Sequence, residues 1–172
     1  MQVFLPYPEF KKSLECLDPT RLGKQIYHEA PILINGGWKN HPAYKIWENH
    51  KYMLCKYGLV GLSVLESRDK KYPRWEKWYS EKIKEFMNTG LPDIVGNDKF
   101  HASHRSKLLF KGRCDGVHKA INKHIKVKKE SITRETVTSF EQLCAELNEP
   151  ITNWYSKFSW NEPDDLDYIW RL

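Results

Sequence analysis

The chain has 172 residues, a formal net charge of +6, and 7 Trp, 9 Tyr and 7 Phe. This length most often gives one domain with a buried core, so we expect a single domain over residues 1–172. The aromatic content excludes disorder over most of the chain. A run of ~18 apolar residues is missing, and so is the basic and then apolar start of a secretory signal. We therefore expect a cytoplasmic protein.

Four cysteines are scattered singly along the sequence, without the CxxC spacing of a zinc site. They are Cys16, Cys55, Cys114 and Cys144. Single cysteines of this kind are typical of reduced thiols in a cytosolic protein rather than of a disulfide framework.

The N-terminal part predicts an arm followed by a helix. The prolines of "MQVFLPYP" forbid a regular helix and indicate an extended arm. Asp18 before Pro19 is typical of a helix start, and Gly36–Gly37 of a helix end, so we expect one helix between them. Pro31 should kink this helix.

Helical periodicity continues through most of the remaining sequence. We expect a helix from about Pro42 into the 60s, a third from near Pro73, and a short one that begins after Asn97 or Asp98 and ends at Gly112. "TSFEQLCAELN", residues 138–148, contains a capping-box pattern and predicts a fifth helix. Clear period-2 strands are missing. The sequence therefore predicts an all-α fold, a compact single-domain helical bundle with an extended N-terminal arm.

Positive charge is concentrated in residues 99–129. This segment holds one acid, Asp115, against ten basic residues: Lys99, Arg105, Lys107, Lys111, Arg113, Lys119, Lys123, Lys126, Lys128 and Lys129. Such a cluster is expected of a protein that binds a polyanion such as nucleic acid. A solvated lysine-rich surface is the plainer interpretation.

The stretch "FHASHRSKLLFKG", residues 100–112, divides into two helical faces. At ~100° per residue, His104, Lys107 and Lys111 gather on a basic face that we expect to be solvated and to contact phosphates. His101 and Arg105 fall on a neighbouring face with leucines, which predicts a half-buried site. The two histidines should therefore point differently.

A metal site is a sharper hypothesis for the same histidines. His101 and His104 could share a metal ion with His41 or His50. However, an HExxH arrangement is missing and Arg105 would repel a cation, so we expect no metal. A catalytic or base-contacting histidine and an ordinary hydrogen-bonded histidine both stay open.

The segment "RLGKQ", residues 21–25, offers a second polar helix face. Arg21 and Gln25 are neighbours at i, i+4, with Lys24 and His28 beside them. An arginine grips phosphate with a bidentate fork and a lysine with a point charge. A nucleic-acid contact and a plain solvated face are both consistent with this pattern.

"NHPAYKIWENH", residues 40–50, places His41 at a helix start and His50 at helical spacing from Trp47. A single histidine on an apolar helix face is more often structural than functional.

Taken together, several short motifs resemble the pyrimidine-dimer DNA glycosylase family. They are "LDPTRLGKQ" (17–25), "NHPAYKIWENH" (40–50), "KYG" (56–58), "FHASHRSKLL" (100–109) and "PDDLDYIW" (163–170). The resemblance covers roughly residues 1–112 and the last dozen. Residues 113–160 are expected to be a basic, helical insertion that is atypical of the family.

The resemblance implies a compact all-α enzyme without metal or cofactor that acts on damaged or modified double-stranded DNA. In the family an amine attacks the sugar, and the strand is cleaved by β-elimination. An N-terminal amine and a glutamate on the first helix carry this chemistry. Arg21 and Lys24 fit the phosphate role by position.

The amine and the carboxylate are assigned to this sequence as follows. Gln2 is too large for removal of the initiator methionine, so the amine belongs to Met1, with a pKa near ~8. Glu29, or Gln25 in a changed role, is the nearest candidate for the glutamate. Lys24 is a fallback amine if it is desolvated.

We therefore expect a monomeric DNA-acting enzyme that excises or processes a damaged or modified base, in the host cytoplasm if the protein is viral. The expected catalytic residues are Met1, Gln25, Glu29, His41 and His101, and the expected nucleic-acid-binding residues are Arg21, Lys24, His104, Arg105, Lys107 and Lys111. The alternatives are a non-catalytic nucleic-acid-binding protein, a base-modifying transferase, and a metal-dependent nuclease.

Overall fold

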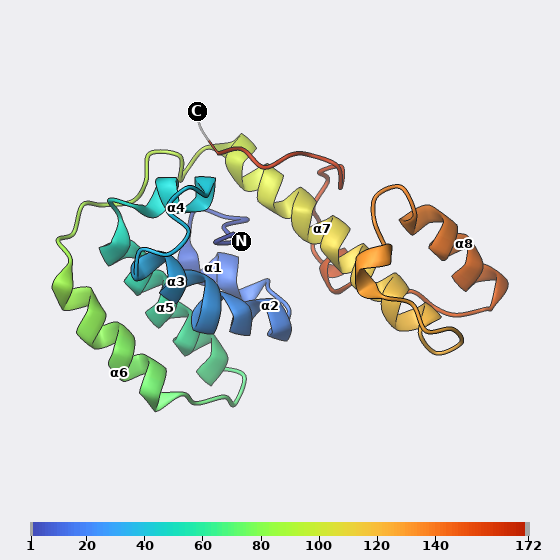
Figure 1. Ribbon diagram of the computed structural model, residues 1–172, viewed down its shortest axis with the longest axis horizontal. Helices are drawn as coiled ribbons and strands as arrows, with labels where there is room; N and C mark the ends of the chain where they lie inside the picture. Colours follow the sequence, from blue (N-terminus) through green and yellow to red (C-terminus); the bar gives the residue numbers. More distant parts are fainter. Residues whose placement is uncertain (1, 171–172) are drawn as a thin grey trace. The chain divides into compact units, whose positions relative to one another are not determined.

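The structure is a computed structural model that describes residues 2–170, and within this range the chain forms helices and no strands (Figure 1). The prediction of an all-α fold is confirmed. The elements are α1 (Phe10–Glu15), α2 (Pro19–Lys24), the π-helix η1 (Gln25–Glu29), α3 (Ala30–Ile34), α4 (Pro42–Trp47), α5 (Lys51–Glu66), α6 (Pro73–Lys82), η2 (Ile83–Glu85), α7 (Asp98–Ile121), η3 (Lys129–Ser131), α8 (Val137–Glu146) and η4 (Trp154–Lys157).

The chain divides into two compact units. The first comprises the residues up to His104 together with the segment from Tyr168 onward, and the second is Arg105–Asp167. The expectation of one domain with an insertion over residues 113–160 stays a prediction. The compact unit that contains this segment begins at Arg105 and not at residue 113.

The predicted N-terminal arm is present. Residues 2–5 have no helical structure, and Val3, Phe4 and Leu5 are buried in the first unit. The arm is therefore a buried, non-helical segment of the first unit. Its backbone polar groups need hydrogen-bond partners from the helices around it.

The predicted helix between Asp18 and Gly36 is present but changes its winding in the middle. The Asp18 side chain caps α2 by accepting a hydrogen bond from the Arg21 N–H at 3.0 Å. After Lys24 the helix widens into η1, where the Ala30 N–H donates to the Gln25 carbonyl five residues earlier. Proline has no N–H to donate and crowds the carbonyl four residues before it. The wider turn directly before Pro31 gives that carbonyl room.

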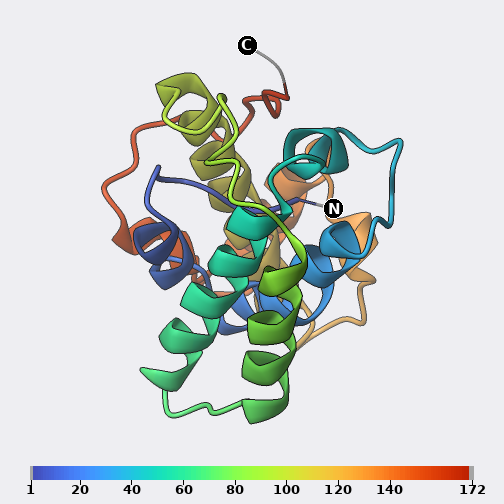
Figure 2. The same ribbon diagram turned by 90° about the vertical axis from the view of Figure 1, so that its left-hand side faces the viewer.

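The predicted second helix is two helices. α4 ends at Trp47 and α5 begins at Lys51, with a break at His50. α5 packs against α1, α3, η1 and α6, and it lies beside α6 in both views (Figures 1 and 2). Gly58 and Gly61 permit this packing, because a Cβ on either would overlap the ring of Tyr79 or the side chain of Ile26.

The prediction that the helix after Asn97 ends at Gly112 is wrong, because α7 continues to Ile121. Gly112 and Gly116 are not stop signals. A Cβ on Gly112 would overlap the Asn153 side chain, and a Cβ on Gly116 would overlap the backbone of Thr152. These glycines allow the segment after α8 to pass close to α7.

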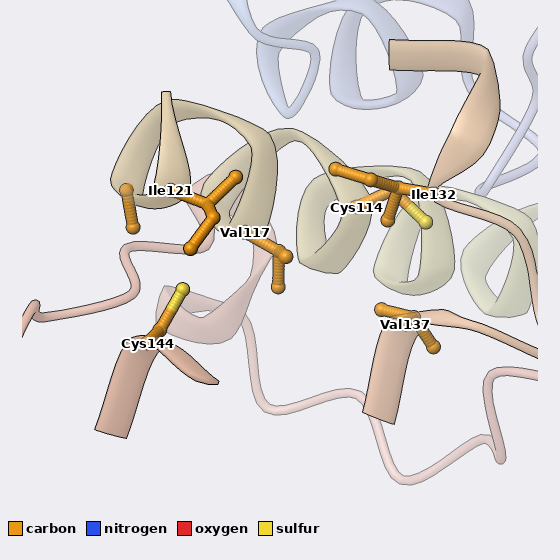
Figure 3. Close-up of a cluster of buried hydrophobic side chains, with 7 residues drawn as sticks. Cys114, Val117, Ile121, Ile132, Val137 and Cys144 are labelled. Carbon is orange, nitrogen blue, oxygen red and sulfur yellow. The ribbon is translucent and has the colours of Figure 1, made fainter. Parts of the chain in front are cut away.

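The second unit has its own small core. Figure 3 shows Cys114, Val117 and Ile121 of α7 with Ile132, Val137 and Cys144. α8 confirms the predicted fifth helix, but the capping box does not form. The helix begins at Val137, and the side chain of its N-cap residue, Thr136, caps no helix N–H and donates to the Ser131 carbonyl at 2.7 Å.

All four cysteines are free and buried, as predicted for reduced thiols. Among the described residues, no helix is long and apolar enough to cross a membrane.

Candidate functional site

The N-terminal arm is held by a buried glutamine on the π-helix. Gln25 Oε1 accepts hydrogen bonds from the Phe4 N–H at 2.8 Å and from the Tyr57 hydroxyl at 2.9 Å. Gln25 Nε2 donates to the Gln2 carbonyl at 2.9 Å. The Tyr57 hydroxyl also lies 3.0 Å from the Phe4 carbonyl. The amide of Gln25 is therefore committed to the backbone of residues 2–4.

Two histidines of α7 hold the next residue of the arm. The Leu5 N–H donates to His104 Nδ1 at 2.9 Å, and the Leu5 carbonyl accepts from His101 Nδ1 at 2.7 Å. His101 Nε2 in turn accepts from the Gly96 N–H at 2.9 Å. A ring nitrogen that accepts a hydrogen bond carries no proton. Both imidazoles are therefore neutral, with opposite tautomers.

These contacts correct the prediction that the two histidines point to different surroundings. His104 is fully buried, so its placement on a solvated basic face is wrong. His101, predicted to be half-buried, is also buried and binds the same arm residue. The helical spacing of "FHASHRSKLLFKG" describes one helix alone. It could not show that the arm, about a hundred residues earlier in the sequence, covers this side of α7.

The neutral form of His104 also fixes the orientation of Gln2. The Gln2 amide lies 2.7 Å from His104 Nε2. Because Nδ1 accepts from Leu5, Nε2 carries the proton and needs an acceptor. We assign the side-chain oxygen of Gln2, Oε1, to this position, since the oxygen and nitrogen of a side-chain amide have nearly the same shape. The first described residue of the chain is thus held at both its backbone and its side chain.

Glu29 is a buried carboxylate at the end of the same π-helix. It is 4% exposed. Its Oε1 lies 3.4 Å from Lys24 Nζ and 3.8 Å from His28 Nδ1. Within residues 2–170, its Oε2 is buried and has no hydrogen-bond partner. A buried oxygen without a partner is costly to fold, and such groups are found at functional sites. A π-turn inside an α-helix is likewise frequent at functional sites.

The two basic residues predicted beside Glu29 differ in exposure. The Lys24 side chain is 61% exposed and reaches Glu29 from the surface. The Arg21 side chain is only 14% exposed and its Nη1 lies 2.7 Å from Asp18. Lys24 is therefore open to solvent and to a phosphate, whereas Arg21 is engaged with the helix cap.

A belt of aromatic rings leads from the buried histidine to the surface. The His104 ring lies 5.5 Å from Tyr168, Tyr168 lies 5.1 Å from Trp170, and Trp170 lies 5.6 Å from His41. The last member, Trp38, lies 5.7 Å from His41 and is 53% exposed. His41 itself caps α4 by accepting the Ala43 N–H at Nδ1.

The charge of Glu29 reaches two members of this belt. Burial lowers the pKa of the His41 imidazole, and the Glu29 carboxylate opposes that fall. Burial raises the pKa of the Tyr168 phenol far above its usual range, Glu29 raises it further, and Arg21 counteracts the rise. Glu29, His41 and Tyr168 therefore belong to one electrostatic neighbourhood.

A family profile described as pyrimidine dimer DNA glycosylase matches residues 1–80. This match supports the family resemblance seen in the N-terminal part of the sequence. The matched segment contains the arm, Gln25, Glu29, His41 and Tyr57. No curated protein and no solved structure gives a significant match to the chain.

The basic residues of α7 lie outside the segment matched by the glycosylase family, and most of those predicted to bind phosphates are engaged within the second unit. Arg105 binds Glu162 at 2.5 Å, Lys107 lies 3.3 Å from Asp167, and Arg113 binds both Glu141 and Asp164. The acidic residues come mainly from the segment before Tyr168. Lys111 is exposed. Arg105 thus meets an acid of its own unit, and its predicted place in one pocket with His101 stays a prediction.

Four other basic residues of the 99–129 segment stay at the surface. Among the described residues, no ion pair is formed by Lys99, Lys119, Lys126 or Lys128, and all four are exposed. The segment therefore keeps part of its positive charge at the surface, and the rest is paired with acids.

Of the predicted site residues, the structure brings Gln25, Glu29, His41, His101 and His104 into the first unit. Met1, the predicted nucleophile, lies outside the described residues. Sequence reasoning did not single out Gln2, Tyr57 and Tyr168 for the site. Tyr57 occurs in the "KYG" motif of the family resemblance and Tyr168 in "PDDLDYIW". Both tyrosines could therefore have been chosen as candidate site residues from these motifs. Within residues 2–170, no three His, Cys, Asp or Glu side chains gather as a metal site would require.

Proposed function

We propose that this protein is a DNA glycosylase with AP-lyase activity, which uses an amine to excise or process a damaged or modified base. The family relationship supports a DNA-acting enzyme. The observation that carries the finer proposal is Glu29, a buried carboxylate with one oxygen that no described residue satisfies.

The π-helix connects Glu29 to the start of the chain. Gln25 and Glu29 are the first and last residues of η1, and Gln25 holds the carbonyl of Gln2. The peptide that follows the N-terminal amine is therefore tied to the helical turn that carries the carboxylate. This arrangement supports Met1 as the source of the nucleophile.

The proposed reaction needs an amine and a carboxylate at one sugar. The amine lone pair attacks C1′, the bond from C1′ to the base breaks, and the departing base takes up a proton. The nitrogen then loses a proton, its electron pair opens the sugar ring by breaking the C1′–O4′ bond, and O4′ takes up a proton. The imine formed at C1′ makes the C2′ protons acidic. Glu29 removes one of them, and the electron pair expels the 3′ phosphate by β-elimination. A positioned carboxylate is a suitable base for that step.

Lys24 is better suited to a phosphate than to the nucleophile. Its side chain is largely exposed, so the desolvation that a nucleophilic lysine requires is missing. An exposed ammonium beside the carboxylate can instead hold the DNA backbone, and such contacts weaken as salt is added.

Gln25, His101 and His104 are positioning residues in this proposal. Their polar atoms are engaged with residues 2–5, with Tyr57 or with Gly96, and none can contact a substrate without breaking those bonds. His41 and Trp38 lie at the open end of the aromatic belt, where an imidazole and an indole can meet a base or sugar.

Borohydride trapping on duplex DNA with an abasic site tests the proposal. The unmodified protein should form a covalent adduct after reduction. Acetylation restricted to the N-terminal amine should abolish the adduct, and Lys24→Met should preserve it. The opposite pattern would assign the amine to Lys24. Binding without any adduct would instead favour a non-catalytic DNA-binding protein.

A further inference from the structure

A cleft of about 350 Å³ opens between α3 and α6, away from the arm and its histidines. It is lined by Pro31, Asn35, Trp75 and Trp78 and by three charged residues, Arg74, Lys77 and Glu81. Both indoles are only half-buried. The cleft therefore presents flat aromatic surface, one side-chain amide and positive charge within a single small space.

The indoles belong to a longer run of aromatic rings. The ring of Tyr72 lies 4.8 Å from Tyr27, Tyr27 lies 5.5 Å from Trp75, and Trp75 lies 5.6 Å from Trp78. Tyr27 comes from η1 and the other three from α6 or the residue before it. Successive half-exposed rings along a surface form a platform on which planar groups can stack.

The charge around these rings is positive. Residues 68–82, "RDKKYPRWEKWYSEK", contain six Lys or Arg against three acids. Arg74 is exposed and forms no ion pair with any residue between 2 and 170. Lys77 lies 3.9 Å from Glu81, and since both side chains are exposed, this pair is too weak to withdraw Lys77 from a ligand.

We propose that this cleft binds an unpaired nucleotide of single-stranded nucleic acid. The base stacks on Trp75 or Trp78, the Asn35 amide meets the polar edge of the base, and Arg74 with Lys77 hold the adjoining phosphates. A cavity of this volume accommodates one base with its sugar. A neutral sugar would leave the cations unused, and an acidic peptide would leave the aromatic faces without a planar partner.

This site is independent of the amine chemistry proposed above. It uses none of the residues that hold the arm, and stacking on aromatic rings is largely insensitive to base sequence. We expect binding of single strands to fall steeply with salt, because the cations of the cleft replace counterions of the phosphates.

Fluorescence anisotropy with a labelled oligo(dT) tests the inference. Trp78→Ala and Arg74→Ala should each weaken binding roughly tenfold, the range that one stacked base or one lost phosphate contact supports. Trp154→Ala is the matched control, because Trp154 is an exposed indole of the second unit with Lys157 over its ring. It should leave the affinity unchanged. Thermal melting establishes that each variant is folded, and the exposed Arg74 keeps the test valid if Trp78→Ala is unstable.

Equal affinities for the unmodified protein, Arg74→Ala and Trp154→Ala would overturn the inference. So would oligo(dT) binding that is lost equally in all three variants. Adduct formation with abasic duplex should persist in Arg74→Ala, and oligo(dT) binding should persist in Glu29→Gln. Failure of one proposal therefore leaves the other standing.

Discussion

His104 accepts the N–H of Leu5 at its Nδ1 atom, over a distance of 2.9 Å. The bond joins the middle of α7 to the fifth residue of the chain and requires an imidazole that is unprotonated at that nitrogen. The arm therefore depends on the tautomer of a fully buried ring.

Replacing this ring should loosen the arm. His104→Ala leaves the Leu5 N–H and the Gln2 side chain without their partner, and unsatisfied buried groups of this kind cost about 1–3 kcal/mol each. We expect a lower free energy of unfolding and faster hydrogen exchange at the Leu5 amide. His118→Ala, in the second unit, should leave the exchange rate of Leu5 unchanged. Unaltered exchange in His104→Ala would contradict the role of His104 in holding the arm.

Glu29→Gln should separate chemistry from folding. The amide keeps the shape of the side chain and removes its charge, and the buried Oε2 atom has no described partner to lose. We expect the free energy of unfolding to change by less than about 1 kcal/mol. Strand cleavage at an abasic site should be lost, whereas the adduct trapped by borohydride should persist, because the imine forms before the C2′ proton is removed. Strand cleavage at a normal rate would show that another group removes the C2′ proton. Glu48→Gln, at an exposed ion pair, is the matched control.

Tyr57→Phe tests the hydrogen bonds around Gln25. The hydroxyl lies within hydrogen-bond distance of both Gln25 Oε1 and the Phe4 carbonyl, and its removal should cost about 1 kcal/mol in unfolding free energy. Because the ring remains, the packing against Phe10 should persist. Adduct formation should slow while DNA affinity is preserved, since the arm is displaced and Lys24, the proposed phosphate contact, is not. Equal losses of affinity and rate would argue against a positioning role.

His41 should make stability depend on pH. Burial lowers its pKa in the folded protein below the ordinary value, so the unfolded chain binds the proton more tightly. Stability then rises with pH, is fully present above ~6.5, and is lost as the pH falls below that value. His41→Asn keeps a capping side chain and should flatten this part of the profile in urea titrations from about pH 5 to 7.5.

A glycine pair tests the packing of α5. Gly58→Ala should destabilise the protein although alanine favours helices, because the new Cβ would overlap the Tyr79 ring. Gly23→Ala, where the nearest atom is 3.6 Å from the new Cβ, should gain about 0.5–1 kcal/mol instead. Thermal melting of the two variants should therefore shift in opposite directions. A gain for both would show that Tyr79 moves aside without cost.

Local signals in the sequence were sufficient for much of the fold. Asp18, the prolines of the arm and the apolar periodicity of α5 and α6 act over a few residues, so the all-α class, the arm and most helix starts were predictable. Gly112 was wrongly predicted to end the helix. A glycine that ends a helix and a glycine that lets another segment pack closely against the helix cannot be distinguished from the neighbouring sequence. Only the contact with Asn153, about forty residues away, distinguishes them.

The residues of the candidate site could be proposed from the sequence, but their geometry could not. Gln25, Glu29, His41 and His101 were named from spacing and family resemblance. The burial of His104 depends on the arm, and the ion pairs of Arg105 and Lys107 depend on acids about sixty residues later. Helical spacing contains no information on such partners. The widened turn at Gln25–Glu29 was also invisible, because a straight helix was the default for the whole stretch.

That widened turn has a consequence for reading related sequences. A π-turn accommodates one more residue than the α-turn it replaces, so every residue after it is displaced by one position relative to an uninterrupted helix. A related chain without the extra residue would present its carboxylate at the same place in space but one position earlier in sequence. An alignment without a gap at Gln25–Glu29 would then set Glu29 opposite a residue of unrelated role, and the pairing of equivalent residues has to be made in three dimensions.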